Sequence, residues 1–180
     1  TGIQNEGVIA TVKHFAANNQ EEWRHRTNSV VDERTLNEIY FPVFKNAIKK
    51  ARVGALMTSY NPLNGVHMAE NRELIEGLIR EQWGFEGIVM SDWLSTYTTI
   101  GCVESGLDLE MPKGNFLNYD SISDLIEKGI VTENEIDEKC INILSTFIRF
   151  GLLDAPYNTE NLPLDNQECC DIAYETAKEG

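Results

Sequence analysis

The sequence has 180 residues, of which 42% are hydrophobic and 24% are charged. Its length corresponds to about one domain, and its composition is that of a globular chain with enough apolar side chains for a core. Acidic residues outnumber basic ones by 29 to 15, so the formal net charge of −14 disfavours nucleic acids and anionic membranes as partners. No stretch approaches the roughly 18 consecutive apolar residues of a membrane-spanning helix.

The cysteines and histidines give no sign of a metal or disulfide site. The four cysteines, at positions 102, 140, 169 and 170, match the spacing of neither a zinc site nor a secreted disulfide framework. They predict free or buried thiols, which favours a reducing compartment. The three histidines, at positions 14, 25 and 67, are not at metal-ligand spacing, so we expect neither a metal nor another cofactor.

Short apolar runs alternate with longer helical patterns along the first 150 residues. The runs that predict strands are 8–13, 53–58, 87–90 and 107–111. The patterns that predict helices are 32–51, 74–83, a weaker one ending near 105, 122–128 and 133–150. Strands that are apolar throughout are covered on both faces, which indicates a parallel sheet inside a layer of helices. The fold class is therefore α/β, and both a doubly wound sheet and a barrel fit this pattern.

Several local signals refine the helices. Asp32 is the expected N-cap of the first long helix, and Pro42 predicts a kink or a missing hydrogen bond within that helix. Gly84 is the expected stop of the second helix. Thr132 and Glu135 have the spacing of a capping box at the start of the last helix.

Chemistry in parallel α/β folds collects where the strands end. At or near the ends of the four predicted strands lie, in order, Lys13-His14, Met57 to Tyr60, Asp92-Trp93, and Asp108 with Glu110. A cation with an imidazole, a phenol and several carboxylates would thus share one rim. This convergence predicts a functional site more strongly than any one of the residues does.

Each of these residues has more than one interpretation. Lys13 could lie at the surface or form a Schiff base with a substrate, as in aldolase-type barrels. Asp92 could cap a helix, or it could serve sugar chemistry beside an indole, Trp93, that stacks on a pyranose. Asp108 and Glu110 would share one face of a strand, where like charges raise a pKa unless each carboxylate caps a backbone or pairs with a lysine.

Six motifs occur in order along the chain. They are KHFAANNQE at 13–21, DERTL at 32–36, MTSYN at 57–61, WGF at 83–85, SDW at 91–93 and GLDLEMP at 106–112. Together they closely resemble glycoside hydrolase family 3, in particular its β-glucosidases, over about residues 5–180. The resemblance implies a (β/α)8 TIM-type barrel that removes terminal β-D-glucosyl residues with retention, through a covalent glycosyl-enzyme intermediate.

The resemblance also implies a role for each matching position. Asp92 corresponds to the nucleophile that attacks the anomeric carbon, whereas Asp108 and Glu110 correspond to structural positions. Substrate-binding roles fall on Lys13, His14, Arg24, Met57, Tyr60 and Trp93. Retaining hydrolysis also needs a second carboxyl group about 5–5.5 Å from the nucleophile. In this family that acid/base is a glutamate of a separate α/β domain after the barrel, so we assign it to no residue of this chain.

The length supports a partial barrel. Four β/α units occupy about 150 residues, whereas a closed barrel of eight units needs about 250. We therefore expect residues 1–154 to be the C-terminal half of the barrel and 155–180 to be a linker to an absent second α/β domain. The missing partners would be the other barrel half and that domain, and the substrate a β-glucoside or cello-oligosaccharide.

Other readings stay open at this point. The isolated chain could be a non-catalytic sugar-binding fragment, or an aldolase-type barrel that uses Lys13. The N-acetylhexosaminidase branch of the family is disfavoured, because its Lys-His-Phe-Pro-Gly-His-Gly loop is replaced here by Lys-His-Phe-Ala-Ala-Asn-Asn. The compartment is undetermined: the cysteines favour the cytoplasm, and the absence of an Asn-x-Ser/Thr sequon is compatible with a bacterial source.

Overall fold

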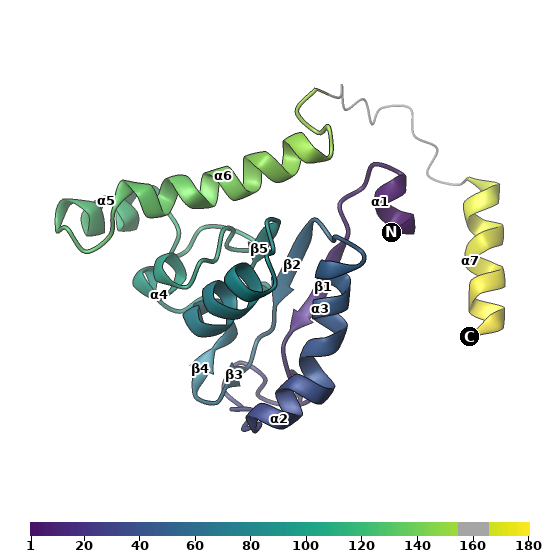
Figure 1. Cartoon of the computed structure of the whole chain (residues 1–180), viewed down its shortest axis with the longest axis horizontal. Coiled ribbons are helices and arrows are strands. Elements are labelled where there is room, and N and C mark those ends of the chain that lie inside the picture. Colours follow the sequence, from purple (N-terminus) through teal and green to yellow (C-terminus); the bar gives the residue numbers. More distant parts are fainter. Residues whose placement is uncertain (155–165) are drawn as a thin grey trace.

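The computed structural model describes residues 1–154 and 166–180. Its centre is a parallel sheet of three strands in the order β1–β2–β5. These strands are β1 (Thr11–Phe15), β2 (Ala55–Thr58) and β5 (Ile88–Met90). Helices connect the strands, with α3 beside β1 (Figure 1), so the α/β prediction is confirmed. The first strand begins later than the predicted range of 8–13.

The predicted fourth strand, residues 107–111, is not a regular strand. It joins the sheet beside β5 through a single parallel bridge between Leu109 and Met90. A side chain replaces the neighbouring ladder bond, because the carboxylate of Asp108 accepts the backbone N–H of Val89 at 2.7 Å. The segment therefore takes the position of a fourth strand without the full ladder.

The first long helix consists of three consecutive pieces, α2 (Glu33–Thr35), η1 (Leu36–Tyr40) and α3 (Phe41–Lys49). Asp32 is its N-cap as predicted, and its side chain accepts a backbone N–H of α2 at 3.0 Å. The piece η1 is π-helical and ends just before Pro42, which has no N–H to donate. The predicted disruption of the helix is confirmed and takes the form of this π-helical segment.

The remaining helices match the predicted order. The second long helix, η3, is π-helical, and the chain leaves it at Gly84 with φ +63°. The capping box at the start of the last long helix is present, with both reciprocal hydrogen bonds between Thr132 and Glu135. The bounds are η3 (Glu73–Gln82), α4 (Thr99–Glu104), α5 (Tyr119–Glu127) and α6 (Glu133–Arg149).

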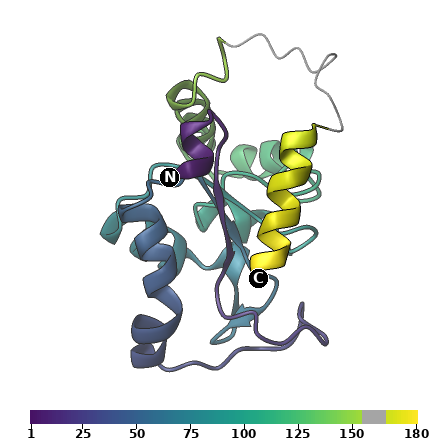
Figure 2. The same ribbon diagram turned by 90° about the vertical axis from the view of Figure 1, so that its right-hand side faces the viewer.

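Five short or peripheral elements complete the described part. They are α1 (Gly2–Asn5), β3 (Pro62–Leu63), β4 (Val66–His67), η2 (Met68–Glu70) and α7 (Gln167–Glu179). Strands β3 and β4 form an antiparallel hairpin, at the same end of the molecule as the segment that joins β1 to α2 (Figure 2). All residues of α7 are exposed. Residues 155–165, the first part of the predicted linker 155–180, lie outside the described residues.

The core fixes the end of β1. Phe15 is fully buried, and its ring centroid lies 5.7 Å from that of Phe41, 5.0 Å from that of Phe44 and 6.1 Å from that of Trp83. Burying an aromatic side chain of this size contributes about 2–3 kcal/mol. Because exposing Phe15 would cost this free energy, the preceding Lys13-His14 pair is held at the end of the sheet.

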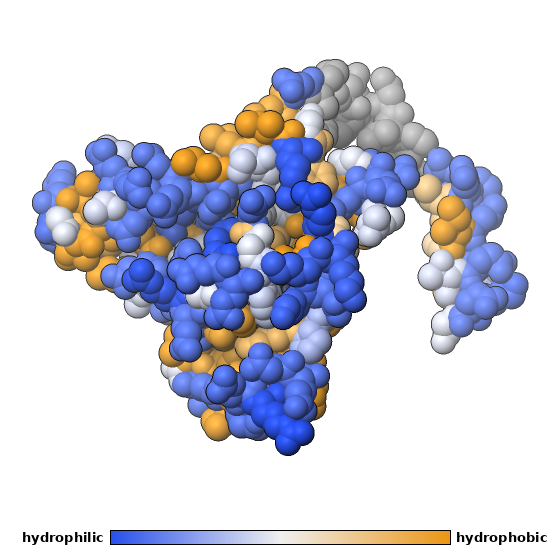
Figure 3. Space-filling view, viewed as in Figure 1, coloured by the Kyte–Doolittle hydropathy of each residue, from blue (hydrophilic) through white to orange (hydrophobic). Residues whose placement is uncertain are grey.

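An apolar stripe lies on the surface of α6. Ile141, Leu144 and Ile148 of α6 are 60%, 49% and 65% exposed, and their spacing places them along one side of the helix. Figure 3 shows apolar side chains gathered over this part of the molecule. No helix of the described ranges is both long and apolar enough to cross a membrane.

Candidate active site

Asp92 lies two residues after the end of β5, at the carboxyl end of the strand, and is 7% exposed. Its Oδ1 accepts the backbone N–H of Trp93 at 2.7 Å, and its Oδ2 lies 3.4 Å from Nε2 of His14. The helix that follows is capped by Thr98, not by Asp92. The helix-cap interpretation of Asp92 is therefore wrong, and its carboxylate instead faces the imidazole that ends β1.

Tyr60 lies beside this carboxylate, and Arg24 lies over the Tyr60 ring. The guanidinium carbon of Arg24 is 3.9 Å from the centroid of the Tyr60 ring, and its Nη1 pairs with Oε2 of Glu21 at 2.6 Å. Burial, and after it the negative charge of Asp92, raises the pKa of the Tyr60 phenol. A protonated phenol and a guanidinium thus lie on the same rim as Asp92.

Lys13, Met57 and Trp93 complete the residues predicted from the sequence. Lys13 is exposed at the end of β1, which does not favour the aldolase-type reading, because a Schiff-base lysine is activated by desolvation. Met57 is half-buried in β2 and is paired with Met90 of β5. The Trp93 indole is 57% exposed. An apolar ring face is therefore open to solvent next to Asp92, as stacking on a sugar requires.

Three polar residues, to which the sequence assigned no role, fix the backbone after Lys13-His14. The side chains of Ser59 and Asn61 both donate to the carbonyl of Ala16, at 3.1 and 3.2 Å. The hydroxyl of Ser29 donates to the carbonyl of Ala17 at 2.9 Å. The Ser-Tyr-Asn motif after β2 was the only available signal for this role, since it follows a strand end directly.

Glu110 is occupied by structural hydrogen bonds. Its Oε2 accepts the backbone N–H groups of Phe116 and Leu117, both at 2.8 Å, and its Oε1 accepts the hydroxyl of Thr96 at 2.7 Å. It is only 5% exposed. These contacts support the structural reading of Glu110, which caps a loop backbone rather than facing the rim.

Asp108 pairs with an arginine rather than with the lysine that the sequence suggested. Its Oδ2 lies 2.5 Å from Nη2 of Arg80, and its Oδ1 accepts the side-chain amide of Asn142 at 2.9 Å. Burial raises the pKa of Asp108, and the Arg80 guanidinium opposes that rise. The buried Lys139 instead donates to the carbonyl of Val103 at 2.8 Å.

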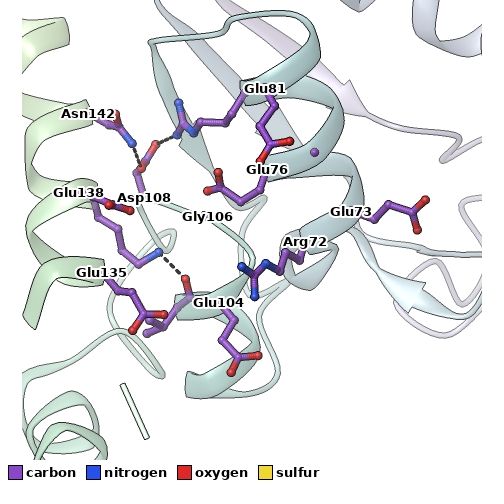
Figure 4. Close-up of a pocket in the computed structure, with 14 residues that line it drawn as sticks. Arg72, Glu73, Glu76, Glu81, Glu104, Gly106, Asp108, Glu135, Glu138 and Asn142 are labelled. Carbon is purple, nitrogen blue, oxygen red and sulfur yellow. Dashed lines mark hydrogen bonds and ion pairs between the residues drawn. The ribbon is translucent and has the colours of Figure 1, made fainter. Parts of the chain in front are cut away.

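These charged residues line a cavity of about 730 Å³ between η3, α4 and α6. Figure 4 shows Asp108 pointing towards Asn142, with Glu76 beside Gly106. None of the residues predicted to bind sugar lines this cavity. The rim around Asp92 is thus a separate region, built from the loops that follow β1, β2 and β5.

The described residues contain no group of three or more His, Cys, Asp or Glu side chains placed to hold a metal ion. All four cysteines are free thiols, as the sequence predicts, with Cys102 buried and the other three exposed. The rim around Asp92 therefore offers a carboxylate, an imidazole, a phenol and a guanidinium. This set suits the binding of hydroxyl groups and nucleophilic attack by a carboxylate.

The sequence profile of the glycosyl hydrolase family 3 N terminal domain matches residues 1–146. The chain belongs to glycosyl hydrolase family 3. It is 43% identical over 143 residues to a probable beta-glucosidase K of Emericella nidulans, a match that covers 79% of this chain and 17% of that protein. It is 40% identical over 179 residues to a beta-glucosidase of Rhizobium radiobacter, a match that covers 99% of this chain and 22% of that protein.

Solved structures of this family match the fold. The beta-glucosidase 3B of Thermotoga neapolitana, in complex with glycerol, superposes with a TM-score of 0.88 at 36% identity, over 99% of this chain and 26% of that one. The GH3 beta-glucosidase of Bifidobacterium adolescentis gives a TM-score of 0.86 at 35% identity, over 98% and 25%. The chain thus spans about a quarter of these proteins, and its fold is part of a TIM-barrel-like α/β domain.

Proposed function

We propose that this chain supplies the nucleophile and much of the glycone subsite of a retaining β-glucosidase. The observation that carries the proposal is the setting of Asp92. Its carboxylate follows a strand of a family 3 sheet, is held by the backbone N–H of Trp93 and faces His14. The beta-glucosidase names of the relatives support a β-glucoside or a cello-oligosaccharide as the substrate.

The geometry suits a division of labour between the two oxygens of Asp92. The backbone N–H holds Oδ1, so Oδ2 is the oxygen that would attack the anomeric carbon. As the new C–O bond forms, the bond to the aglycone breaks, and the leaving oxygen takes a proton from an acid outside this chain. Water then releases the sugar, with that acid acting as the base.

The other rim residues would bind and orient the sugar. Lys13 and His14 would hold glycone hydroxyls, and Trp93 would stack on the pyranose. Met57 and Tyr60 would line the same subsite, and Arg24 would bind the sugar and orient Asp92. Fixed donors placed around the reacting carboxylate lower the barrier because they need no reorganisation during the reaction.

We also propose that residues 1–154 are the C-terminal half of the barrel and that 155–180 lead to a second α/β domain, which supplies the acid/base glutamate. The relatives are about four to six times longer than the stretch that this chain matches, which supports missing partners of this kind. The isolated chain is then expected not to turn over 4-nitrophenyl β-glucoside.

Covalent labelling tests the proposal. The full-length protein is treated with 2,4-dinitrophenyl 2-deoxy-2-fluoro-β-D-glucoside, whose leaving group needs no acid, and the labelled peptide is sequenced by mass spectrometry. We expect the ester on Asp92 and no label in Asp92→Asn. The exposed Asp124 of α5 provides a matched control, since Asp124→Asn should label normally. A label on another carboxylate, or borohydride trapping of a substrate on Lys13, would overturn the proposal.

A further inference from the structure

His25, the residue after Arg24, contacts two other strand-end loops. Its Nδ1 is 3.1 Å from the hydroxyl of Tyr97, and its ring centroid is 4.4 Å from that of Tyr60. Tyr60 follows β2, and Tyr97 lies in the loop after β5 that also carries Asp92. The half-buried imidazole of His25 therefore links the loop after β1, to which it belongs, to the loops after β2 and β5.

Tyr97 is itself held firmly. Its backbone N–H donates to Oε1 of Glu70 at 2.9 Å, and its ring stacks on that of His67 with centroids 3.6 Å apart. Glu70 also accepts the backbone N–H of Thr98. These partners come from β4 and η2, which the reacting carboxylate does not touch. Tyr97 is thus a fixed point to which His25 is attached.

The protonation of His25 agrees with this role. Burial, and after it the positive charge of Arg24, lowers the pKa of His25, while Asp92 opposes that shift. A neutral imidazole can hydrogen-bond the Tyr97 hydroxyl, as donor or acceptor, without repelling the neighbouring guanidinium. The other ionisable groups around the pair are Tyr60, His67 and Glu70.

We infer that His25 is a positioning residue, which holds Arg24 and Tyr60 against Asp92 by linking their loops to Tyr97. The inference rests on the proposed role of Asp92, and it requires no contact between His25 and the substrate. Without the link, the loop carrying Arg24 would lose its attachment to the loop after β5. Misplacement of reactive groups by about 1 Å lowers rates by about 100-fold.

The test uses steady-state kinetics of the full-length protein with 2,4-dinitrophenyl β-D-glucoside across pH. We expect His25→Ala and Tyr97→Phe to lower kcat by about 10- to 100-fold. Tyr97→Phe keeps the ring that stacks on His67, so it tests the link even where His25→Ala folds poorly. The double variant should be no worse than the worse single one, because both remove the same link.

Two further variants separate positioning from a general structural role. His25→Asn, whose amide lies where Nδ1 of the imidazole lies and can still bond the Tyr97 hydroxyl, should recover most of kcat and lose any acid limb of the pH profile that comes from His25. Arg26→Ala, an exposed neighbour in the same loop, should match the wild type in kcat and Tm. Wild-type kcat in both His25→Ala and Tyr97→Phe would overturn the inference, and so would a double variant that multiplies the two losses. Normal labelling of Asp92 in these variants would show that the proposed function itself stands.

Discussion

Two buried aspartates lie near the same strand, β5, but in different surroundings. Asp92 is 7% exposed and Asp108 is 6% exposed, so burial alone does not distinguish them. Asp108 accepts hydrogen bonds from a guanidinium, a backbone N–H and an amide, which together use both of its oxygens. Asp92 has one backbone N–H on one oxygen and an imidazole at 3.4 Å from the other. A carboxylate saturated by donors stabilises a fold, whereas one with oxygen lone pairs to spare is available for chemistry.

The regions around them differ in the same way. Asp108 lies between η3 and α6, where Arg80 also donates to the carbonyl of Gly87 just before β5. Two of its partners, Arg80 and Asn142, come from helices that line the same cavity, and the third is a backbone N–H of β5. The partners of Asp92 are His14, near the carboxyl end of β1, and Trp93, in the loop after β5. Function gathers at such strand ends and loops because changes there leave the sheet intact. The comparison yields four predictions, given from the largest expected effect to the smallest.

Asp92→Asn should abolish turnover and leave stability nearly unchanged. Loss of a nucleophile costs about 10^4-fold or more in kcat, while the amide can still accept the Trp93 N–H. The measurement is kcat of the full-length protein with 4-nitrophenyl β-glucoside, together with Tm by calorimetry. A large fall in Tm would show that Asp92 is structural, as Asp108 is, and would contradict the proposed difference in role between the two aspartates.

Asp108→Ala should have the opposite effect. It leaves the Arg80 guanidinium, whose side chain is 12% exposed, without its carboxylate, and breaking such a buried pair costs about 3–5 kcal/mol. Urea unfolding gives the free energy, and Asp124→Asn, on the exposed face of α5, provides the control. A loss below about 1 kcal/mol, the range of a surface pair, would contradict the assignment.

Gly106→Ala should destabilise the same region moderately. Gly106 has φ +82°, and a Cβ there would meet the carboxylate of Glu76. The flexible glutamate can move, so the backbone conformation sets the cost, at about 1–2 kcal/mol. Gly77→Ala is the matched control, because that helical glycine has open space around it and should gain up to about 1 kcal/mol. Equal effects of the two substitutions in urea unfolding would contradict this prediction.

The smallest effect concerns pH. Burial lowers the pKa of His25 and of His67 from 6.5. As the pH falls through about 6.5, the unfolded chain takes up protons before the folded chain does, so the free energy of unfolding decreases until the folded-state pKa values are passed. Urea midpoints at pH 7.5 and 5.5 should therefore differ less in the double variant His25→Gln, His67→Gln than in the wild type. If the urea midpoints of the double variant differ between the two pH values as much as those of the wild type, neither histidine causes the pH dependence.

The sequence was sufficient to predict which residues gather around Asp92, but not which residues surround Asp108. Asp92 and Tyr60 each follow a strand and His14 lies near the carboxyl end of another, and parallel strands bring these ends together whatever the detailed packing. The partners of Asp108 are 28 and 34 residues away in sequence, on two different helices, so no local pattern indicates them.

The same limit applies to smaller features. Residues 107–111 read as a strand because they form a short run with apolar residues that ends before Pro112, yet the Asp108 side chain competes for a ladder hydrogen bond. Pro42 signals a missing N–H in the first helix, but the π-helical form of η3 has no comparable marker in its sequence. His25 gave no signal beyond its residue type, since its contacts join three loops that only the fold brings together.

The loop between β1 and α2 has its two ends tied together. Ser29 binds the carbonyl of Ala17 through its hydroxyl and the N–H of Asn64 through its own carbonyl. A loop closed at its base in this way behaves as a module, and doubling its length costs only about 0.6 kcal/mol in closure entropy. Residues 18–23 could therefore be exchanged for a longer segment at little cost in stability, provided that Arg24 and His25 keep their places.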